Sequence, residues 1–234
     1  MIVTIHQPNH LPYLGFFDKM ASADVFVLYD NTQYASYDVA FQNRNKIRTS
    51  DKQGWIWLTV PVTAKLGTLI KDVKIADQHW RKKHWKSIEM NYGKAPYFSK
   101  YKEIFQAIYD KEWDNLADFN IALITALRDA FGIKTKLVRG SDIIPHLEAK
   151  ATDALVQICT TLKATVYISG RDGETYLELG KFKDKNIAVE FLNYVHPEYP
   201  QAYPGFQPYM CALDLLFNAG PKSLEILHNA SHDK

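Results

Sequence analysis

MIVTIHQPNHLPYLGFFDK, residues 1–19, is the stretch of this chain that decides the fold. The run from Met1 to Ile5 is short, apolar and rich in β-branched residues, a pattern typical of a buried strand. Two prolines, an asparagine and two histidines in residues 6–12 then interrupt it, and neither a central strand nor a helix interior continues through such a sequence. From residue 13 onward, apolar side chains recur with helical spacing. The stretch therefore predicts a strand, a tight polar loop and a helix.

The polar loop is the first candidate site. In an α/β sheet such a loop lies at the carboxyl end of a strand and faces a helix N-terminus, where ligands and anions bind. His6, Gln7, Asn9 and His10 would then offer their side chains to a ligand. A structural turn with two surface histidines is the alternative interpretation. His6 could also be a packed histidine that orients the loop.

A second strand is expected over residues 24–30, because this run is apolar and lies between polar segments. Strand, helix and strand within about thirty residues predict a right-handed crossover and parallel pairing. Asp30 and Gln33 would then lie at the same end of the sheet as His6 and His10. Residues 55–62 predict a third strand, so residues 1–62 are expected to supply at least three strands of one sheet.

The rest of the chain alternates between helical and strand patterns. Helices are expected over 80–92, twice within 97–131, over 150–162 and over 212–217, and strands over 134–138, 166–170 and 188–192. This alternation predicts an α/β fold with a parallel or mixed sheet and helices on both faces. We expect one domain, residues 1–234, with a mainly helical segment at about 80–131.

The composition is that of an ordinary globular protein, with 47% hydrophobic and 23% charged residues in a chain of 234. A net charge of +2 is too small to argue for nucleic acid as a partner. Cys159 and Cys211 lie in apolar runs, so both are expected to be buried free thiols, which fits a reducing cytoplasm. No signal peptide and no apolar run of about eighteen residues is present, so no membrane span is expected. The sequence does not indicate an oligomeric state.

Three further polar clusters lie at residues 43–46, 82–84 and 169–172. Together they suit an anionic ligand, because arginine binds oxyanions bidentately and lysine supplies a point charge. The alternative for the basic clusters is a solvated surface. No zinc-ligand spacing, Walker loop or dinucleotide glycine fingerprint occurs, so no metal site is predicted from the residues. The aromatic loop 199–209 is either a lid or sugar-stacking wall, or a loop packed on itself. The candidate binding residues are Asn43, Arg44, Asn45, Lys46, Lys83, His84, Ser169, Gly170, Arg171, Asp172, Tyr203 and Phe206.

Distinctive motifs occur along nearly the whole chain: His6-Gln7-Pro8, Pro12-Tyr13-Leu14-Gly15-Phe16-Phe17 and Gln42-Asn43-Arg44-Asn45-Lys46-Ile47, followed later by Tyr167-Ile168-Ser169-Gly170 and His196-Pro197-Glu198-Tyr199. Together they resemble the motifs of the WbqC-like protein family. Tyr13 stands where the family usually has tryptophan. Members similar to this chain are found among bacterial surface-polysaccharide genes, so the resemblance implies a role in O-antigen-type polysaccharide biosynthesis.

A second resemblance is to the nucleotidyltransferases of the HxGH class. His10 matches the first histidine of that motif, whereas Pro12 and Tyr13 replace its glycine and second histidine. The stretch from Ser169 through Tyr176 and Leu177 resembles the Ser- and Arg-bearing loop of pantothenate synthetases, which activate a carboxylate as its adenylate. These matches imply a Rossmann-like fold and ATP with Mg²⁺ as cofactors.

The leading hypothesis from the sequence is a cytoplasmic transferase or ligase that binds a nucleotide or nucleotide-sugar and transfers an acyl or aminoacyl group to an amino sugar. The alternative is a non-catalytic module that binds nucleotide-sugars or partner enzymes. In the first case the side chains that offset phosphoryl charge would be His6, His10, Arg44, Lys83 and Arg171, and Asp30 or Asp172 would hold Mg²⁺.

Overall fold

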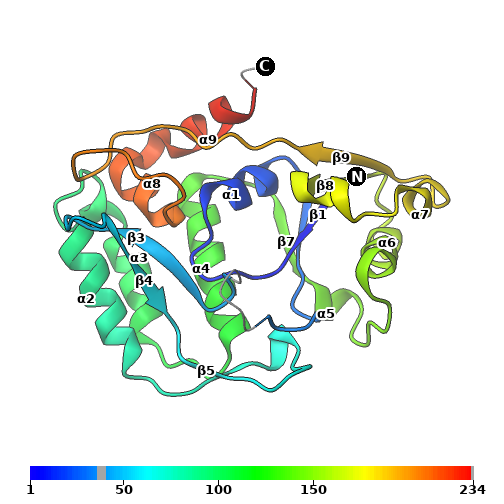
Figure 1. The fold of residues 1–234 in the computed structure, drawn as a ribbon, viewed down its shortest axis with the longest axis horizontal. Helices are drawn as coiled ribbons and strands as arrows, with labels where there is room; N and C mark the ends of the chain where they lie inside the picture. The colour runs from blue at the N-terminus through cyan, green and yellow to red at the C-terminus, as the bar shows by residue number, and fades with distance from the viewer. Residues whose placement is uncertain (36–40, 233–234) are drawn as a thin grey trace.

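A parallel β-sheet of five strands lies at the centre of the computed structural model, which describes residues 1–35 and 41–232 (Figure 1). The order across the sheet is β7-β2-β1-β8-β9, and every neighbouring pair is parallel. The strands are β1 (Ile2–His6), β2 (Val25–Leu28), β7 (Lys136–Arg139), β8 (Val166–Gly170) and β9 (Ala188–Leu192). The predicted βαβ unit is present, with α1 (Leu14–Ala21) between β1 and β2.

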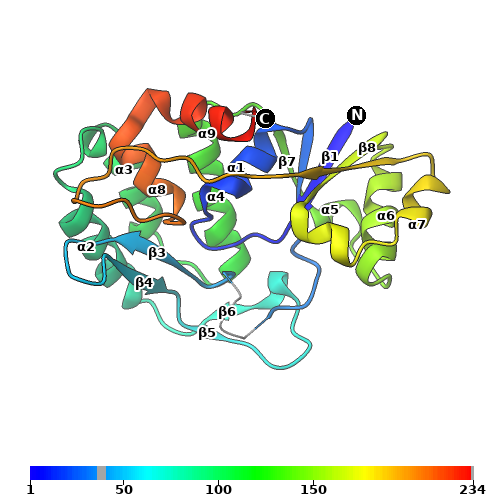
Figure 2. The same cartoon turned by 45° about the horizontal axis from the view of Figure 1, so that its top comes forward.

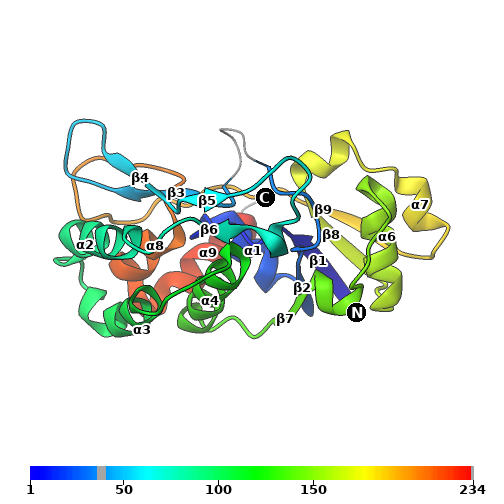
Figure 3. The same ribbon diagram turned by 90° about the horizontal axis from the view of Figure 1, so that it is seen from below.

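The sheet separates two hydrophobic cores, because successive side chains of a strand point to opposite faces. Val3 and Ile5 of β1 belong to one core, whereas Phe16 and Phe17 of α1 belong to the other. Figures 1 and 3 show α1 and α4 on one side of the sheet and α6 and α7 on the other. The helices around the sheet are α4 (Leu116–Phe131), α5 (Gly140–Ile143), α6 (Ala151–Thr161), α7 (Leu179–Lys183), α8 (Ala212–Ala219) and α9 (Ser223–His232). The fold is thus α/β and Rossmann-like, as the sequence predicted.

Residues 80–131 form three successive helices, α2 (Trp80–Tyr92), α3 (Phe98–Asp110) and α4, and each packs on the next. The start of α4 is fixed by Asn115, whose side chain accepts hydrogen bonds from two backbone N–H groups of the first turn. Its end is fixed by Gly132 in the left-handed conformation, with φ of 78°. Whether these helices belong to the same domain as the sheet stays a prediction.

The third strand expected from residues 1–62 does not join the central sheet. Trp55–Thr59 forms β4, which pairs antiparallel with β3 (Arg44–Arg48) in a separate hairpin. The polar cluster Asn43-Arg44-Asn45-Lys46 therefore lies at the start of this hairpin, with its last three residues in β3. An apolar run indicates a buried strand but does not show which strand it pairs with. Here β3 also contacts α2, because the backbone N–H of Arg48 donates a hydrogen bond to the Tyr92 hydroxyl at 2.9 Å.

Shorter elements complete the described chain: β5 (Val62–Thr63), β6 (Lys74–Ile75) and the 3₁₀ turns η1 (Ile70–Asp72), η2 (Arg171–Thr175) and η3 (Gly220–Lys222). Cys159 and Cys211 are both buried and free, as predicted. Within residues 1–35 and 41–232, no helix has the length and apolar character needed to cross a bilayer.

Candidate functional site

A pocket of about 590 Å³ opens at the carboxyl ends of β1 and β8. From β1 the chain proceeds through β2 to β7 on one side, whereas β8 and β9 lie on the other side. The direction of the connections therefore changes between β1 and β8, and in open α/β sheets ligands bind in the crevice outside such a point. The volume lies within the range of small-molecule sites.

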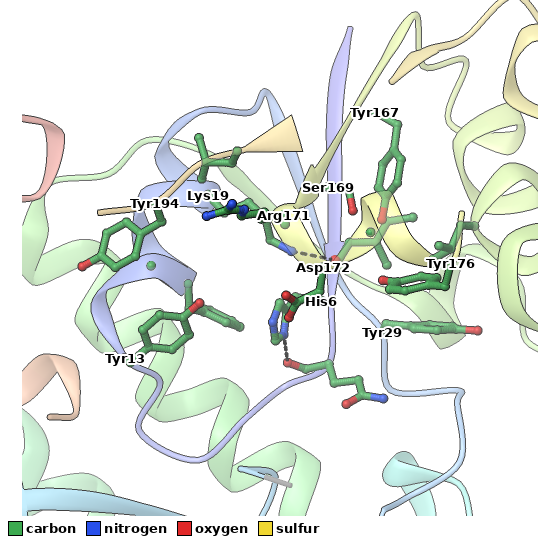
Figure 4. A pocket seen from close by; sticks show the side chains of 18 of the residues that line it. His6, Tyr13, Lys19, Tyr29, Tyr167, Ser169, Arg171, Asp172, Tyr176 and Tyr194 are labelled. Atoms are coloured by element: carbon green, nitrogen blue, oxygen red, sulfur yellow. Dashed lines mark hydrogen bonds between the residues drawn. The ribbon is translucent and has the colours of Figure 1, made fainter. Parts of the chain in front are cut away.

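Tyrosine rings make up much of the pocket wall. Tyr13 and Tyr194 lie on one side of His6, and Tyr29 and Tyr176 lie on the other (Figure 4). Their flat faces and hydroxyl groups suit a ligand that combines rings with polar substituents, such as a nucleoside or a sugar. The tyrosines that line the pocket are Tyr13, Tyr29, Tyr167, Tyr176, Tyr194 and Tyr209.

Gly15 allows two of these rings to lie against the first turn of α1. A Cβ atom at this position would come within 2.6 Å of the Tyr13 ring and 2.8 Å of the Tyr194 ring. The two rings meet edge to face, with centroids 5.9 Å apart. Burial is the main reason that the pKa of Tyr13 is raised, and the nearby Asp172 adds to the effect.

His6, the last residue of β1, lies in the pocket as a neutral imidazole. Its Nδ1 is 3.0 Å from the backbone oxygen of Gln7, so Nδ1 carries the proton and donates, and Nε2 keeps its lone pair. Burial lowers the pKa of His6 to about 3, and the positive charge of Lys19 contributes to this. The imidazole is thus a proton acceptor next to an amine.

Lys19 is the least expected residue of the pocket. It belongs to α1, is 7% exposed, and its Nζ donates to the Ile5 backbone oxygen of β1 at 3.1 Å. Among the described residues no carboxylate forms an ion pair with it, and the preceding Asp18 lies near His228, with 4.0 Å between Oδ1 and Nδ1. Burial lowers the pKa of Lys19 to about 7.

Arg171 and Asp172 enter the pocket from η2, directly after β8. Within the described part of the chain no carboxylate pairs with Arg171, so its guanidinium is available to a ligand. Ser169, 2% exposed, lies in the same pocket near Tyr167 (Figure 4). A hydrogen bond from Ser169 partly offsets the rise in pKa that burial causes in Tyr176.

The structure brings eight of the residues singled out in the sequence into this pocket and places the others elsewhere. The first group comes from the ends of β1 and β8, the start of α1 and η2. It consists of His6, Gln7, Tyr13, Ser169, Gly170, Arg171, Asp172 and Tyr176. The residues that do not line the pocket are Asn9, His10, Asp30, Gln33, Asn43, Arg44, Asn45, Lys46, Lys83, His84, Tyr203 and Phe206.

His10 lies in the protein interior and not in the pocket. It is fully buried, stacks on Phe119 with ring centroids 5.5 Å apart, and donates from Nδ1 to Asn120 Oδ1 at 3.2 Å. Asn120 of α4 in turn donates to the backbone oxygens of Pro8 and Gln42. His84 of α2 lies beside His10, with 5.9 Å between the ring centroids. The expectation that His10 shares the pocket of Arg171 is therefore wrong, because the loop after β1 turns inward beyond Gln7.

Asp30 lies at the same end of the sheet as His6, as expected, but its carboxylate is already occupied. It is fully buried, pairs with Arg139 at 2.8 Å, and accepts from the backbone N–H and the hydroxyl of Ser141. These contacts connect the end of β2 with β7 and the residues that follow it.

Arg44, Lys46 and Lys83, the basic residues singled out in the first half of the sequence, also lie outside the pocket. Arg44 and Lys46 of β3 lie over the rings of Trp57 and Trp55, at 4.5 and 4.0 Å from the centroids. Lys83 is exposed on α2. Arg44 and Arg171 therefore do not converge on one pocket, because β3 belongs to the separate hairpin.

The aromatic loop is held against the hairpin by Arg48, whose Nη2 donates to the backbone oxygens of Pro204 and Gly205. The hydroxyl of Tyr203 donates to the backbone oxygen of Asn91, and Phe206 packs against the core. Figure 2 shows the segment after β9 running across α1 before it reaches α8. Two tyrosines of this segment, Tyr194 and Tyr209, line the pocket.

Lys19, Tyr29 and Tyr194 are pocket residues that sequence reasoning missed, whereas Tyr209 belongs to the aromatic loop 199–209, for which a lid or sugar-stacking wall was one interpretation. The one signal for Lys19 is a charged pair, Asp18-Lys19, inside an otherwise apolar helix in which both residues are buried. The tyrosines carry no signal, since each lies in a segment whose route across the sheet cannot be deduced from composition.

Comparison with known proteins gives two matches. A sequence model described as the WbqC-like protein family matches residues 7–226. An uncharacterized protein of Mycobacterium tuberculosis is 35% identical over 229 residues, which covers 96% of each chain. No solved structure matches.

Proposed function

The chain belongs to the WbqC-like protein family, and from this membership and the pocket we propose that it is an enzyme of bacterial surface-polysaccharide biosynthesis that binds a nucleotide or a nucleotide-linked sugar. The observation that carries the proposal is Arg171, a guanidinium in a tyrosine-walled pocket with no carboxylate partner among the described residues. Arginine binds phosphate oxygens through two parallel hydrogen bonds.

The reaction class that the side chains support best is group transfer, such as acyl or aminoacyl transfer to an amino sugar. His6 offers a neutral imidazole with a free Nε2 lone pair, which is what removal of a proton from an attacking amine or hydroxyl requires. The guanidinium of Arg171 would hold phosphate charge, and the tyrosine rings would enclose the base or sugar and exclude water.

ATP with Mg²⁺ is part of the proposal. Magnesium is often held by one or two carboxylates together with nucleotide phosphates. Asp172 lines the pocket beside Arg171 and fits this role, whereas both Asp30 oxygens already accept hydrogen bonds. When bound, the metal would neutralise charge on the phosphate oxygens.

Calorimetry and thermal unfolding with ATP, CTP, UDP-sugars and dTDP-sugars, each with and without Mg²⁺, test the binding part. Arg171→Ala should weaken a phosphorylated ligand by about 1.5–3 kcal/mol, the range for a hydrogen bond to a charged group. Arg44→Ala is the matched control, because it removes an arginine outside the pocket and should leave the affinity unchanged. Equal losses in both variants, or no loss in either, would contradict the assignment of Arg171.

Turnover is tested by phosphate or pyrophosphate release with a panel of carboxylate donors and amine acceptors. His6→Gln should keep the nucleotide affinity and lower turnover by roughly 10²-fold or more, the usual contribution of a general base. If nucleotides bind but no combination releases phosphate, the protein is a binding module of the same pathway and the catalytic part of the proposal fails.

A further inference from the structure

Lys19 has fewer hydrogen-bond acceptors than an ammonium group needs. A protonated lysine carries three N–H donors, and the described residues provide Nζ with one acceptor, the Ile5 backbone oxygen at 3.1 Å. The side chain is 7% exposed, so water can reach it only through the pocket that it lines. No ion pair joins it to Asp172, the carboxylate of the same pocket.

An uncharged amine suits this position better than an ammonium. It can donate one hydrogen to Ile5 and direct its lone pair elsewhere, which avoids a buried charge without a partner. The protonated imine of a lysine keeps the positive charge, but it carries a single N–H, which matches the single acceptor that Ile5 offers.

Next to this amine lies a group that can move protons. Both side chains line the same pocket (Figure 4), and a proton on Lys19 would lower the pKa of His6 further. His6 donates a hydrogen bond from Nδ1 to the Gln7 backbone oxygen, so Nε2 can accept a proton. A nucleophilic amine beside a neutral imidazole is a nucleophile and base pair.

We propose that Lys19 is an imine-forming residue, and that the pocket takes an aldehyde or ketone group of a ligand that also carries phosphate. The phosphate part rests on the function proposed above for Arg171, whereas the imine part rests on Lys19 and His6 alone.

The chemistry balances within the pocket. The Nζ lone pair forms a bond to the carbonyl carbon, and the carbonyl oxygen takes up the displaced electron pair and a proton. His6 Nε2 accepts a proton from Nζ and returns it to the carbinolamine hydroxyl, which leaves as water when the C=N bond forms. The proton taken up by the carbonyl oxygen comes from solvent, and Nζ keeps its second hydrogen, so loss of water gives the protonated imine, whose N–H can donate to Ile5 O.

Pyridoxal 5′-phosphate is the probe, since it combines an aldehyde with a phosphate and has a size suited to the pocket. The protein is incubated with the probe at neutral pH, the imine is followed by its visible absorption, and borohydride reduction fixes it for peptide mass spectrometry. At pH 7 an amine with a pKa near 7 has roughly 10³ times the uncharged fraction of an ordinary lysine. We therefore expect Lys19 to be the main modified residue, at least about tenfold above any exposed lysine, after allowance for its weaker intrinsic nucleophilicity.

Variants separate the parts of the proposal. Lys19→Met should abolish the selective imine, and Lys83→Arg, which alters an exposed lysine on α2, should not. His6→Gln should slow imine formation by roughly 10²-fold while the final extent stays the same. The peptide map of the wild-type protein decides the main point even if a variant does not fold.

Modification spread over exposed lysines, with no preference for Lys19, would overturn the proposal. Pyridoxal, which lacks the phosphate, provides the second arm. If Lys19 reacts equally well with both aldehydes and Arg171→Ala changes nothing, the imine site stands and the phosphate-binding function is refuted. Preference for the phosphorylated aldehyde that Arg171→Ala removes supports both.

Discussion

Replacing Lys19 by methionine should change how the stability of the protein depends on pH. The pKa of Lys19 is lowered from 10.5 to about 7 in the folded protein, so between these values the unfolded chain binds one proton more at this site. The free energy of unfolding of the wild type therefore rises with pH in this window, by about 1.4 kcal/mol per pH unit. Lys19→Met lacks this term. From pH 7.5 to pH 9 the wild type should thus gain about 2 kcal/mol relative to the variant.

Urea unfolding at four or five pH values between 7.5 and 9 measures this difference for both proteins. Only the change with pH is compared, so a constant effect of methionine on packing does not matter. Lys83→Met serves as the control for loss of one lysine from an exposed helix position. A difference between wild type and Lys19→Met that is constant over this range would show that Lys19 stays charged in the fold, and the argument from its single acceptor would be refuted.

Three other substitutions or conditions test the structure around the pocket. Arg139→Met should destabilise the protein by about 3–5 kcal/mol in chemical denaturation, because it leaves the buried Asp30 carboxylate without its cation. Gly220→Ala should lower the melting temperature, because the added Cβ would lie 2.4 Å from the Tyr97 ring and φ is +55°; an unchanged melting temperature would contradict this. Burial lowers the pKa of His10 to about 3, so the unfolded chain takes up the proton first and stability should fall as the pH drops from 6.5 toward 3. His10→Gln should reduce that acid sensitivity in thermal unfolding, and an identical pH profile would count against a neutral buried imidazole.

Local patterns in the sequence were enough to predict the central sheet. β9 was expected over residues 188–192 and found there, and β8 likewise over 166–170, because both are apolar runs between turn signals. The carboxyl ends of parallel strands meet at one edge of the sheet, so His6 and Ser169 to Asp172, which come at the ends of predicted strands, could be assigned to that edge from the sequence.

The remainder of the site depends on contacts between distant segments. His10 was predicted to bind the ligand because it lies in the same loop as His6. In the structure it is buried and hydrogen-bonded to Asn120, which is 110 residues away in the sequence. Lys19 reaches the pocket because its long side chain extends back along α1 to β1, and no periodicity encodes that direction. Tyr194 joins the wall because the chain after β9 crosses α1.

The central position of β1 also has a consequence for synthesis of the protein. Its local neighbour β2 is made almost at once, but its other neighbour is β8, and Thr4 donates to the backbone oxygen of Ile168 across a separation of 164 residues. At about 5–20 residues per second, roughly ten to thirty seconds of translation pass before that edge can be paired. During this time the first βαβ unit exposes an unpaired strand rich in isoleucine and valine, which is a site for association with other nascent chains. Ribosome-bound chains that end before residue 166 should therefore depend on chaperones, and chains that include β8 and β9 should not.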